Sequence, residues 1–337
     1  MNASVASITP LQGERTPGLS EGACDYLRRD ERRIIITGAG GWIGRATLDL
    51  LARCLGFETA RDRVRCFGTS SRQIEVENGI TFDQLPLSAI HDLQKRPSIV
   101  LHLAFLTKDK VAGMAEDDYR QANAELSREV AEALGALGAD RLFVASSGAA
   151  AHAEDPEASH DLRLYGRLKR DDEELFATWA AQRPCRRAVI ARICNLSGPH
   201  INKFQTYALA SFIIDALAGE AISIKAQVPV TRSYVALREL MSLVFSSLLA
   251  DEGEQVLRFD SGGEAHELGE LARCIATAIG PVPIKRAPLS HGPANHYVGD
   301  DGRYRELLAQ HRIEHVDLVT QVLETAAFIS SQPEFTK

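Results

Sequence analysis

The feature that most constrains the fold is a glycine-rich segment, Thr37-Gly38-Ala39-Gly40-Gly41-Trp42-Ile43-Gly44. The β-branched run at residues 33–37 predicts a strand that is buried on both faces, as in a parallel sheet. Apolar residues then recur at helical spacing over residues 42–55. A strand, a glycine turn and a helix in this order are typical of the first unit of a doubly wound α/β fold.

The pattern continues through the next 140 residues or so. Strands alternate with amphipathic helices, and this alternation predicts a doubly wound parallel sheet of the Rossmann type. Beyond residue 198 the regularity weakens, which indicates a smaller mixed α/β lobe that carries the substrate site. The predicted strands cover 64–68, 98–103, 141–146 and 187–193, and the predicted helices between them cover 115–137 and 164–181.

These patterns suggest a division of the chain. Residues 1–31 are polar and rich in Ser, Gly and Pro, and we interpret them as a mobile leader with a short helix near its end. Residues 32–199, with return segments near 236–262, form the predicted dinucleotide-binding domain. Residues 200–235 and 263–337 form the predicted substrate lobe.

Composition excludes several classes of protein. The formal net charge is −7, and an acidic chain does not favour nucleic acid or an anionic membrane as a partner. No apolar run is long enough to span a bilayer, and the first residues lack the pattern of a secretory signal. The cysteines form no CxxC pair or metal-type cluster, so we expect reduced thiols, no metal and a cytoplasmic protein.

The glycine loop indicates a dinucleotide site. Gly38 suits the tight turn, Gly41 lets the backbone approach a pyrophosphate, and Gly44 allows close packing of helix on strand. The phosphates would meet N–H groups at the start of the helix, with Trp42 and Ile43 beside the groove.

The end of the second strand bears on which dinucleotide binds. An acidic residue there would bind the ribose diol of NAD, but the chain runs Gly68-Thr-Ser70-Ser71-Arg72, with no carboxylate before Glu75. Hydroxyls and a guanidinium suit a 2′-phosphate. The residues therefore favour NADP(H), and NAD(H) stays open if Arg72 contacts nothing.

A tyrosine and a lysine point to acid–base chemistry. Tyr165 and Lys169 stand at i and i+4 on a predicted helix and so share one face. A nearby cation favours the phenolate, which would fit Tyr165 to exchange a proton with a hydroxyl while hydride moves to or from nicotinamide. Lys169 would also hold the nicotinamide ribose. Two serines, Ser146 and Ser147, stand at the end of a predicted strand before this helix, where a hydroxyl can polarise a carbonyl.

The Gly-x-x-Gly-x-x-Gly loop, the YxxxK pair and the run Arg192-Ile-Cys-Asn195-Leu-Ser-Gly198-Pro199 together resemble the extended short-chain dehydrogenase/reductase family of nucleotide-sugar epimerases, dehydratases and ketoreductases. The resemblance implies that Leu103 and Ala104 line the cofactor, and that Asn195 contacts substrate. Of the two serines, it favours Ser147 as the group that polarises the carbonyl, with Ser146 as the runner-up. It implies that Arg232 grips a nucleotide-sugar pyrophosphate, and that the chain forms a homodimer through its two long helices.

The chain departs from that family in ways that bear on the reaction. Ser147-Gly148-Ala149 lacks the acidic pair of the dehydratases, and the loop at 152–161 is short. We therefore expect an NADP(H)-dependent oxidoreductase that interconverts a carbonyl and a secondary alcohol, on a nucleotide-activated sugar. The alternatives are a nucleotide-sugar epimerase that recycles NAD, a reductase of a non-sugar ketone, and a non-catalytic dinucleotide-binding protein.

Overall fold

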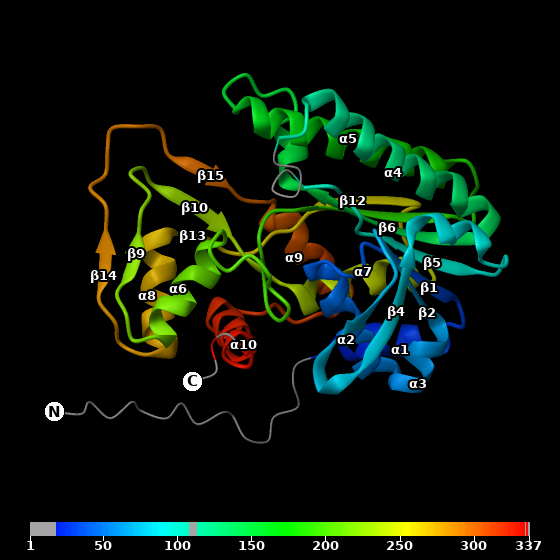
Figure 1. Ribbon diagram of the computed structural model, residues 1–337, viewed down its shortest axis with the longest axis horizontal. Helices are drawn as coiled ribbons and strands as arrows, with labels where there is room; N and C mark the ends of the chain where they lie inside the picture. Colours follow the sequence, from blue (N-terminus) through cyan, green and yellow to red (C-terminus); the bar gives the residue numbers. More distant parts are fainter. Residues whose placement is uncertain (1–17, 108–112, 334, 336–337) are drawn as a thin grey trace.

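The computed structural model describes residues 18–107, 113–333 and 335 of the chain. Figure 1 shows a large sheet with helices on both of its faces, and a smaller lobe beside it that contains α6, α8 and α10. The two parts correspond to the predicted Rossmann domain and the predicted mixed α/β lobe.

The main sheet has eight strands in the order β12-β7-β6-β5-β1-β2-β4-β3. Only the edge pair β3–β4 is antiparallel, so the predicted doubly wound parallel sheet is confirmed. Sequence patterns did not predict β3 and β4. The strands are β1 (Arg33–Thr37), β2 (Val64–Gly68), β3 (Arg72–Glu75), β4 (Thr81–Pro86), β5 (Ser98–His102), β6 (Ala139–Ser147), β7 (Arg187–Ile193) and β12 (Val256–Asp260).

Side chains of the sheet alternate between two cores. Ile34 and Ile36 belong to the core beneath α2 and α7, whereas Ile35 belongs to the core beneath α4 and α5. All three isoleucines are fully buried, which explains the unbroken β-branched run. The helices of this part are α1 (Glu21–Arg29), α2 (Trp42–Leu55), α3 (Phe57–Arg63), α4 (Glu116–Leu137), α5 (His160–Ala181), α7 (Leu237–Leu249) and α9 (Asp301–Gln310), with 3₁₀ turns η1 (Glu77–Gly79), η2 (Leu87–Asp92) and η4 (Gly148–His152).

The smaller lobe has its own core between α6, α8 and α10. Its strands are short: β10 pairs with β13 and β15, β9 pairs with β14, and β8 pairs with β11. The bounds are β8 (Leu196–Ser197), α6 (Ala208–Leu217), β9 (Ile222–Ile224), β10 (Val230–Ser233), β11 (Val235–Ala236), β13 (Ala265–Glu267), α8 (Leu268–Ile279), β14 (Ile284–Arg286), β15 (Asn295–Tyr297) and α10 (Leu318–Ser330).

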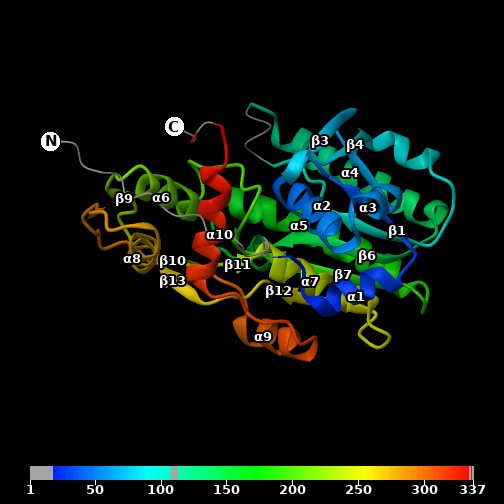
Figure 2. The ribbon, with the colours of Figure 1, turned by 90° about the horizontal axis from the view of Figure 1, so that it is seen from below.

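The structure differs from the division that we expected at two places. Residues 18–31 are not a mobile leader, because α1 packs on α2 and α7 and completely buries Ala23 and Leu27; residues 1–17 lie outside the described residues. Within 263–337, α9 packs on β12, and its Tyr304 and Leu307 join the core of the main sheet. Figure 2 shows α9 and α1 beneath that sheet.

The six cysteines all lie in the described part of the chain, and they form no disulfide there. In the same residues, no helix combines the length and the apolar character that crossing a bilayer requires.

Candidate active site

The carboxyl-terminal edge of the main sheet gathers the residues that the sequence singled out. β1, β5, β6 and β7 run parallel, so the segments that follow them emerge side by side. These segments carry the glycine loop after β1, Leu103 and Ala104 after β5, Ser147 at the end of β6, and Asn195 after β7.

The glycine loop has the shape that was expected of it. Gly38 has φ of +74°, and a Cβ there would lie 2.7 Å from the main-chain nitrogen of Ala104. A Cβ on Gly44 would overlap the carbonyl oxygen of Ala39, so glycine lets α2 pack closely on the loop. Gly41 is the N-cap of α2 and makes no side-chain cap hydrogen bond. The loop therefore leads directly into the start of α2, and the first backbone N–H groups of a helix can bind a phosphate.

Trp42 and Ile43 begin α2 and have different surroundings. Ile43 is partly buried against the core of the main sheet. The Trp42 indole donates a hydrogen bond from Nε1 to the carbonyl oxygen of Pro199, 2.8 Å away, and its ring centroid lies 5.4 Å from that of Tyr207. Trp42 thus ties the glycine loop to the smaller lobe.

The segment after β2 faces the same loop. Ser70, Ser71 and Arg72 are exposed, and the Ser70 carbonyl accepts a hydrogen bond from Gln84 at 2.8 Å. The Arg72 guanidinium lies where a Cβ on Gly40 would be, so it covers the glycine loop. A guanidinium is suited to binding phosphate oxygens.

The loop after β5 is fixed by helix α4. Asn123, whose side chain is buried, accepts a hydrogen bond from Leu106 N at 2.8 Å and donates to Leu106 O at 3.3 Å. In β5, the buried His102 ring lies 2.9 Å from the Thr37 hydroxyl, and burial lowers its pKa to about 3. A histidine that stays neutral at physiological pH is a packing residue here and not an acid.

Helix α5 brings Tyr165 and Lys169 beside β6. Gly166 makes this approach feasible, because a Cβ there would overlap the Ala149 carbonyl oxygen. The Lys169 ammonium donates to the Ala145 carbonyl at 3.0 Å and lies 3.7 Å from the centroid of the Phe105 ring. That ring in turn packs edge-on against Tyr165, with centroids 5.4 Å apart.

Burial shifts the pKa values of Tyr165 and Lys169 so that both neutral forms are favoured. Acid–base chemistry with this pair needs the opposite, a tyrosine that can ionise and a lysine that stays charged. Burial raises the pKa of Tyr165 to about 12, a rise that the neighbouring Ser147 hydroxyl partly opposes. It lowers the pKa of Lys169 to about 8, a fall that Asp172 and Glu173 oppose. A cationic nicotinamide placed here would favour the phenolate of Tyr165.

The two candidate serines have different partners. Ser146 donates to the buried Glu173 carboxylate at 2.5 Å, and Arg192 contacts both oxygens of that carboxylate at 2.9 and 2.7 Å. Ser147 instead lies beside Tyr165, and its Oγ is 2.9 Å from the Tyr297 hydroxyl. The structure thus brings Ser147, Tyr165 and Lys169 together and leaves Ser146 in a structural network.

Two aromatic residues of this site were missed by sequence reasoning. Phe105 follows Ala104 directly, and its contact with Lys169 was not anticipated. Tyr297 comes from β15, which pairs with β10 in the smaller lobe, and its ring also stacks on His152 at 6.4 Å. Neither residue lies in a periodic pattern, so the sequence alone offered no signal for them.

The proposed substrate residues lie near Tyr297. Asn195 donates to the Ser233 carbonyl at 3.0 Å. The Arg232 guanidinium donates to the carbonyls of Thr231 and Asn295, and it lies 6.0 Å from the Tyr297 ring centroid. Asn195 therefore borders the candidate site from the segment after β7, and Arg232 borders it from β10 of the smaller lobe. Of the 152–161 loop, His152 borders it too, while Glu157 and His160 are exposed.

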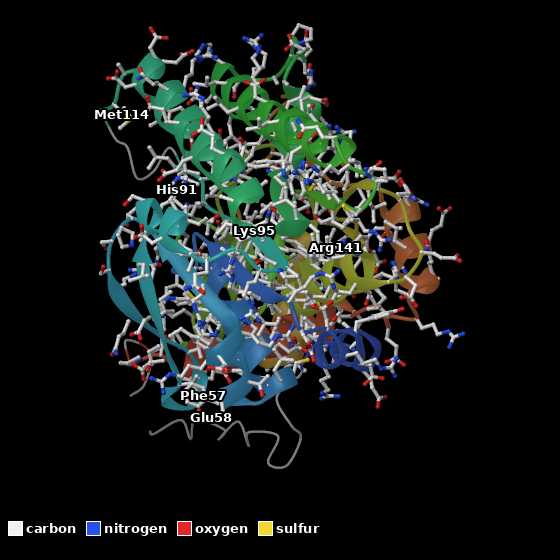
Figure 3. The ribbon with its side chains drawn as sticks, turned by 90° about the vertical axis from the view of Figure 1, so that its right-hand side faces the viewer. Phe57, Glu58, His91, Lys95, Met114 and Arg141 are labelled. Carbon is white, nitrogen blue, oxygen red and sulfur yellow. The ribbon has the colours of Figure 1, made fainter. Side chains whose placement is uncertain are left out.

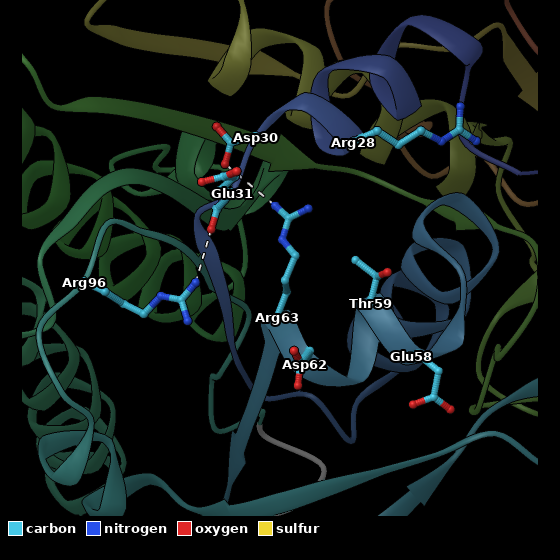
Figure 4. Close-up of a pocket in the computed structure, with 8 residues that line it drawn as sticks. All are labelled: Arg28, Asp30, Glu31, Glu58, Thr59, Asp62, Arg63 and Arg96. Atoms are coloured by element: carbon cyan, nitrogen blue, oxygen red, sulfur yellow. Dashed lines mark hydrogen bonds and ion pairs between the residues drawn. The ribbon is translucent and has the colours of Figure 1, made fainter.

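Two other features do not carry the chemistry. A polar surface cavity between α1 and α3 lies at the amino-terminal edge of the sheet. Figure 4 shows that Arg63 pairs with Asp30 there and that Arg96 binds the main-chain carbonyl of Glu31. Asp49, Glu77 and His200 lie close enough to share a metal, but the Arg53 guanidinium contacts both carboxylates. A cation already occupies that place.

The fold is that of a dinucleotide-binding α/β enzyme, and it brings Ser147, Tyr165 and Lys169 together at one edge of the sheet. The family model described as the NAD dependent epimerase/dehydratase family matches residues 34–259, and the chain belongs to this family. Its members are enzymes of the extended short-chain dehydrogenase/reductase type, so that resemblance is confirmed. A search of the curated proteins found no match.

Solved structures show the same fold over nearly the whole chain. An epimerase from Methanothermobacter thermautotrophicus is 18% identical, with a TM-score of 0.68 over 93% of this chain and 97% of the other. UDP-glucose 4-epimerase from Thermus thermophilus, solved with NAD, is 22% identical, with a TM-score of 0.66 over 89% and 99%. UDP-N-acetylglucosamine 4-epimerase from Methanobrevibacter ruminantium, solved with UDP-N-acetylmuramic acid, is 19% identical, with a TM-score of 0.69 over 90% and 99%.

Proposed function

We propose that this protein is an NADP(H)-dependent oxidoreductase that interconverts a carbonyl and a secondary alcohol on a nucleotide-activated sugar. The observation that carries the proposal is the convergence of Ser147, Tyr165 and Lys169 at the sheet edge that also holds the glycine loop. The bound dinucleotide would supply the hydride chemistry, and the chain would supply placement and a proton.

Each residue of the centre has a distinct part. The Tyr165 hydroxyl gives a proton to the substrate oxygen in reduction and takes it back in oxidation. The Ser147 hydroxyl donates a hydrogen bond to the same oxygen and orients it. Lys169 supplies a fixed positive charge one turn from Tyr165, which stabilises the phenolate left after proton transfer. For substrate to reach Ser147, the Tyr297 hydroxyl must release its contact with Oγ.

Arg72 supports the preference for NADP(H). It lies against the glycine loop, and the segment between Gly68 and Arg72 contains no carboxylate to accept a ribose diol. The epimerase with recycled NAD is the second candidate. What favours it is that several of the similar structures are 4-epimerases, three of them solved with NAD. A 4-epimerase would oxidise and re-reduce one carbon with the same three residues.

Arg232 is the basis for a nucleotide sugar. Its guanidinium borders the reaction centre from β10 and is suited to phosphate oxygens. R232A should therefore raise KM strongly for a nucleotide sugar, whereas a reductase of a non-sugar ketone would not need this residue.

The homodimer remains a prediction. Helices α4 and α5 pack against each other on one face of the sheet, as Figure 1 shows, and they would form the shared surface. Their outward side chains include the charged Arg128, Asp171 and Glu174 beside Leu175, so a dimer there would need paired charges across it.

The test of the reaction is Y165F, which removes the proton donor and keeps the ring. We expect kcat to fall by about two to four orders of magnitude, the usual contribution of a positioned acid–base group. Coenzyme affinity should change little. Y26F on α1, at the other edge of the sheet, is the matched control and should keep full activity. Unchanged turnover in Y165F would refute the assignment, and a non-catalytic protein would show no turnover in either form.

A further inference from the structure

The reaction centre contains a buried acid that the mechanism above does not use. Asp172 stands three residues after Lys169 on α5, and both residues are only 5% exposed. Its Oδ2 lies 3.9 Å from the Lys169 ammonium nitrogen. Its Oδ1 accepts a hydrogen bond from the Ser127 hydroxyl of α4 at 2.6 Å.

The two oxygens of Asp172 are in different situations. Ser127 satisfies Oδ1, but no donor among the described residues hydrogen-bonds Oδ2, which faces Lys169. Burial of a carboxylate is costly unless it is paired or hydrogen-bonded. Alanine would stabilise the helix better at this position. The buried Asp172 carboxylate therefore lowers the stability of the fold, and the group that its Oδ2 faces is the Lys169 ammonium.

The other ionisable groups around Lys169 are already accounted for. Glu173 on α5 is held by Ser146 and by Arg192 of β7. His102 on β5 is neutral, because burial lowers its pKa to about 3. Tyr165 on the same helix is protonated at rest, since burial raises its pKa to about 12.

Asp172 is thus the acid left to balance Lys169. Apart from Asp172, the ammonium contacts the Ala145 carbonyl and the face of the Phe105 ring. Both favour a cation, but neither carries a negative charge. The charged neighbours of Asp172 itself are Lys169, Glu173 and the exposed Asp171.

We propose that Asp172 is a positioning residue: its carboxylate, oriented by Ser127, keeps the Lys169 ammonium charged and fixed beside Tyr165 during turnover. The catalytic consequence rests on the proposed function, whereas the effect on the charge of Lys169 does not. Loss of the carboxylate removes an attraction that opposes the burial of the ammonium, so Lys169 loses its proton at lower pH.

The test is D172N, which removes the charge and keeps the shape, with D171N as the matched control on the exposed face. Activity should decline on the alkaline side as Lys169 deprotonates, near pH 8 in the wild type. We expect D172N to move this alkaline limb to lower pH by about one unit, a tenfold change in the ratio of charged to neutral lysine. D171N should leave it in place. An unmoved limb in D172N, or an equal movement in D171N, overturns the proposal.

A second readout separates this inference from the proposed function. The ¹³Cε signal of Lys169, assigned by its absence in K169R, can be titrated by NMR without substrate. Its midpoint should fall by about the same unit in D172N. If D172N lowers the Lys169 midpoint but the protein reduces no carbonyl, the proposed function is refuted and the inference about Asp172 stands. If the enzyme is active but the midpoint in D172N is unchanged, the inference is refuted and the proposed function stands.

S127A covers the case in which D172N fails to fold. It keeps the carboxylate and removes only the hydrogen bond that orients it. We expect the Lys169 midpoint to stay within about half a unit of wild type, while kcat falls severalfold with little change in KM. A kcat equal to wild type would show that Ser127 does not orient Asp172 for the reaction.

Discussion

At the residue scale, the candidate site depends on which of two adjacent serines lies beside Tyr165. Ser147 reaches the reaction centre because β6 turns into η4 directly after it, and its Oγ accepts from the Ala149 N–H at 3.3 Å. Ser146, one residue earlier, points to the opposite side of the strand and binds Glu173. One position in register therefore separates a candidate catalytic hydroxyl from a structural one.

The two serines can be told apart by mutation. S147A should lower kcat by about 10²-fold, because it removes a hydrogen bond to the reacting oxygen. S146A should keep kcat and lower the free energy of unfolding by about 1–3 kcal/mol, because it leaves the buried Glu173 with one donor fewer. The measurements are steady-state kinetics and urea unfolding of both variants. The opposite pattern would exchange the two roles.

Much of this site was readable from the sequence at the level of single residues. The glycine loop, Ser147, Tyr165 and Lys169 stand in motifs whose spacing is set by one strand end or one helical turn. Phe105, Tyr297 and Asp172 were not found. The position of Tyr297 depends on β15, a three-residue strand that pairs with β10 across 65 residues of chain, and local patterns do not report such pairing.

At the scale of elements, the longer helices and the buried strands were predictable, and the β3–β4 edge of the main sheet was not. β1, β5 and β7 are apolar runs covered on both faces, which gives them a clear signal. β3 and β4 lie at an edge and mix exposed with buried residues. α1 was taken as part of a leader because it follows a polar segment, although its buried face anchors it on α7.

Helix α1 should contribute measurably to stability. Leu27 is fully buried against the core of the main sheet. L27A should lower the free energy of unfolding by about 2–5 kcal/mol, the usual cost of removing a buried leucine side chain. R29A on the exposed side of the same helix is the control and should change it by less than about 0.5 kcal/mol. Urea denaturation of both variants measures the difference, and an L27A value near zero would mean that α1 is detached in solution.

An ion contact joins α7 to the segment before α10. The His315 ring nitrogen Nδ1 lies 3.2 Å from the fully buried Glu239 carboxylate, and this contact raises the pKa of His315 above its usual value. A raised folded-state pKa means that the stabilisation is complete below the unfolded pKa of about 6.5 and is lost as pH rises through the folded value.

The pH dependence of stability tests this contact. The difference in free energy of unfolding between wild type and H315Q should be largest near pH 6 and should shrink toward pH 9. H91Q, at an exposed position on the outer face shown in Figure 3, is the control and should change the free energy of unfolding by less than about 0.5 kcal/mol. Denaturant titrations at several pH values provide the data. If the difference in free energy of unfolding between wild type and H315Q grows as the pH rises, the pKa of His315 is not raised by this contact.

At the scale of the whole molecule, the two parts meet at the reaction centre. The main sheet supplies the dinucleotide loop and the Ser/Tyr/Lys set, and the smaller lobe supplies Tyr297, Arg232 and Trp42's partner Tyr207. Under the proposed function, the main sheet would hold the cofactor, and the smaller lobe would contact the substrate and set specificity. The structures of the same fold that are solved with UDP-sugars or NAD are less than 25% identical in sequence to this chain. The cofactor of this chain must therefore be inferred from its own side chains.

The measurement that tests the account most directly is coenzyme selection by the purified protein. Untreated protein is denatured and any released nucleotide is identified by mass spectrometry. Emptied wild-type protein, R72A and the exposed control R61A are then titrated with NADPH and NADH. We expect that the purified protein retains no tightly bound NAD. The wild type should prefer NADPH to NADH at least tenfold, because a guanidinium–phosphate contact is worth about 1.5–3 kcal/mol. R72A should lose this preference, and R61A should keep it. About one NAD per chain that survives dialysis would contradict the reading of Arg72 and favour an epimerase.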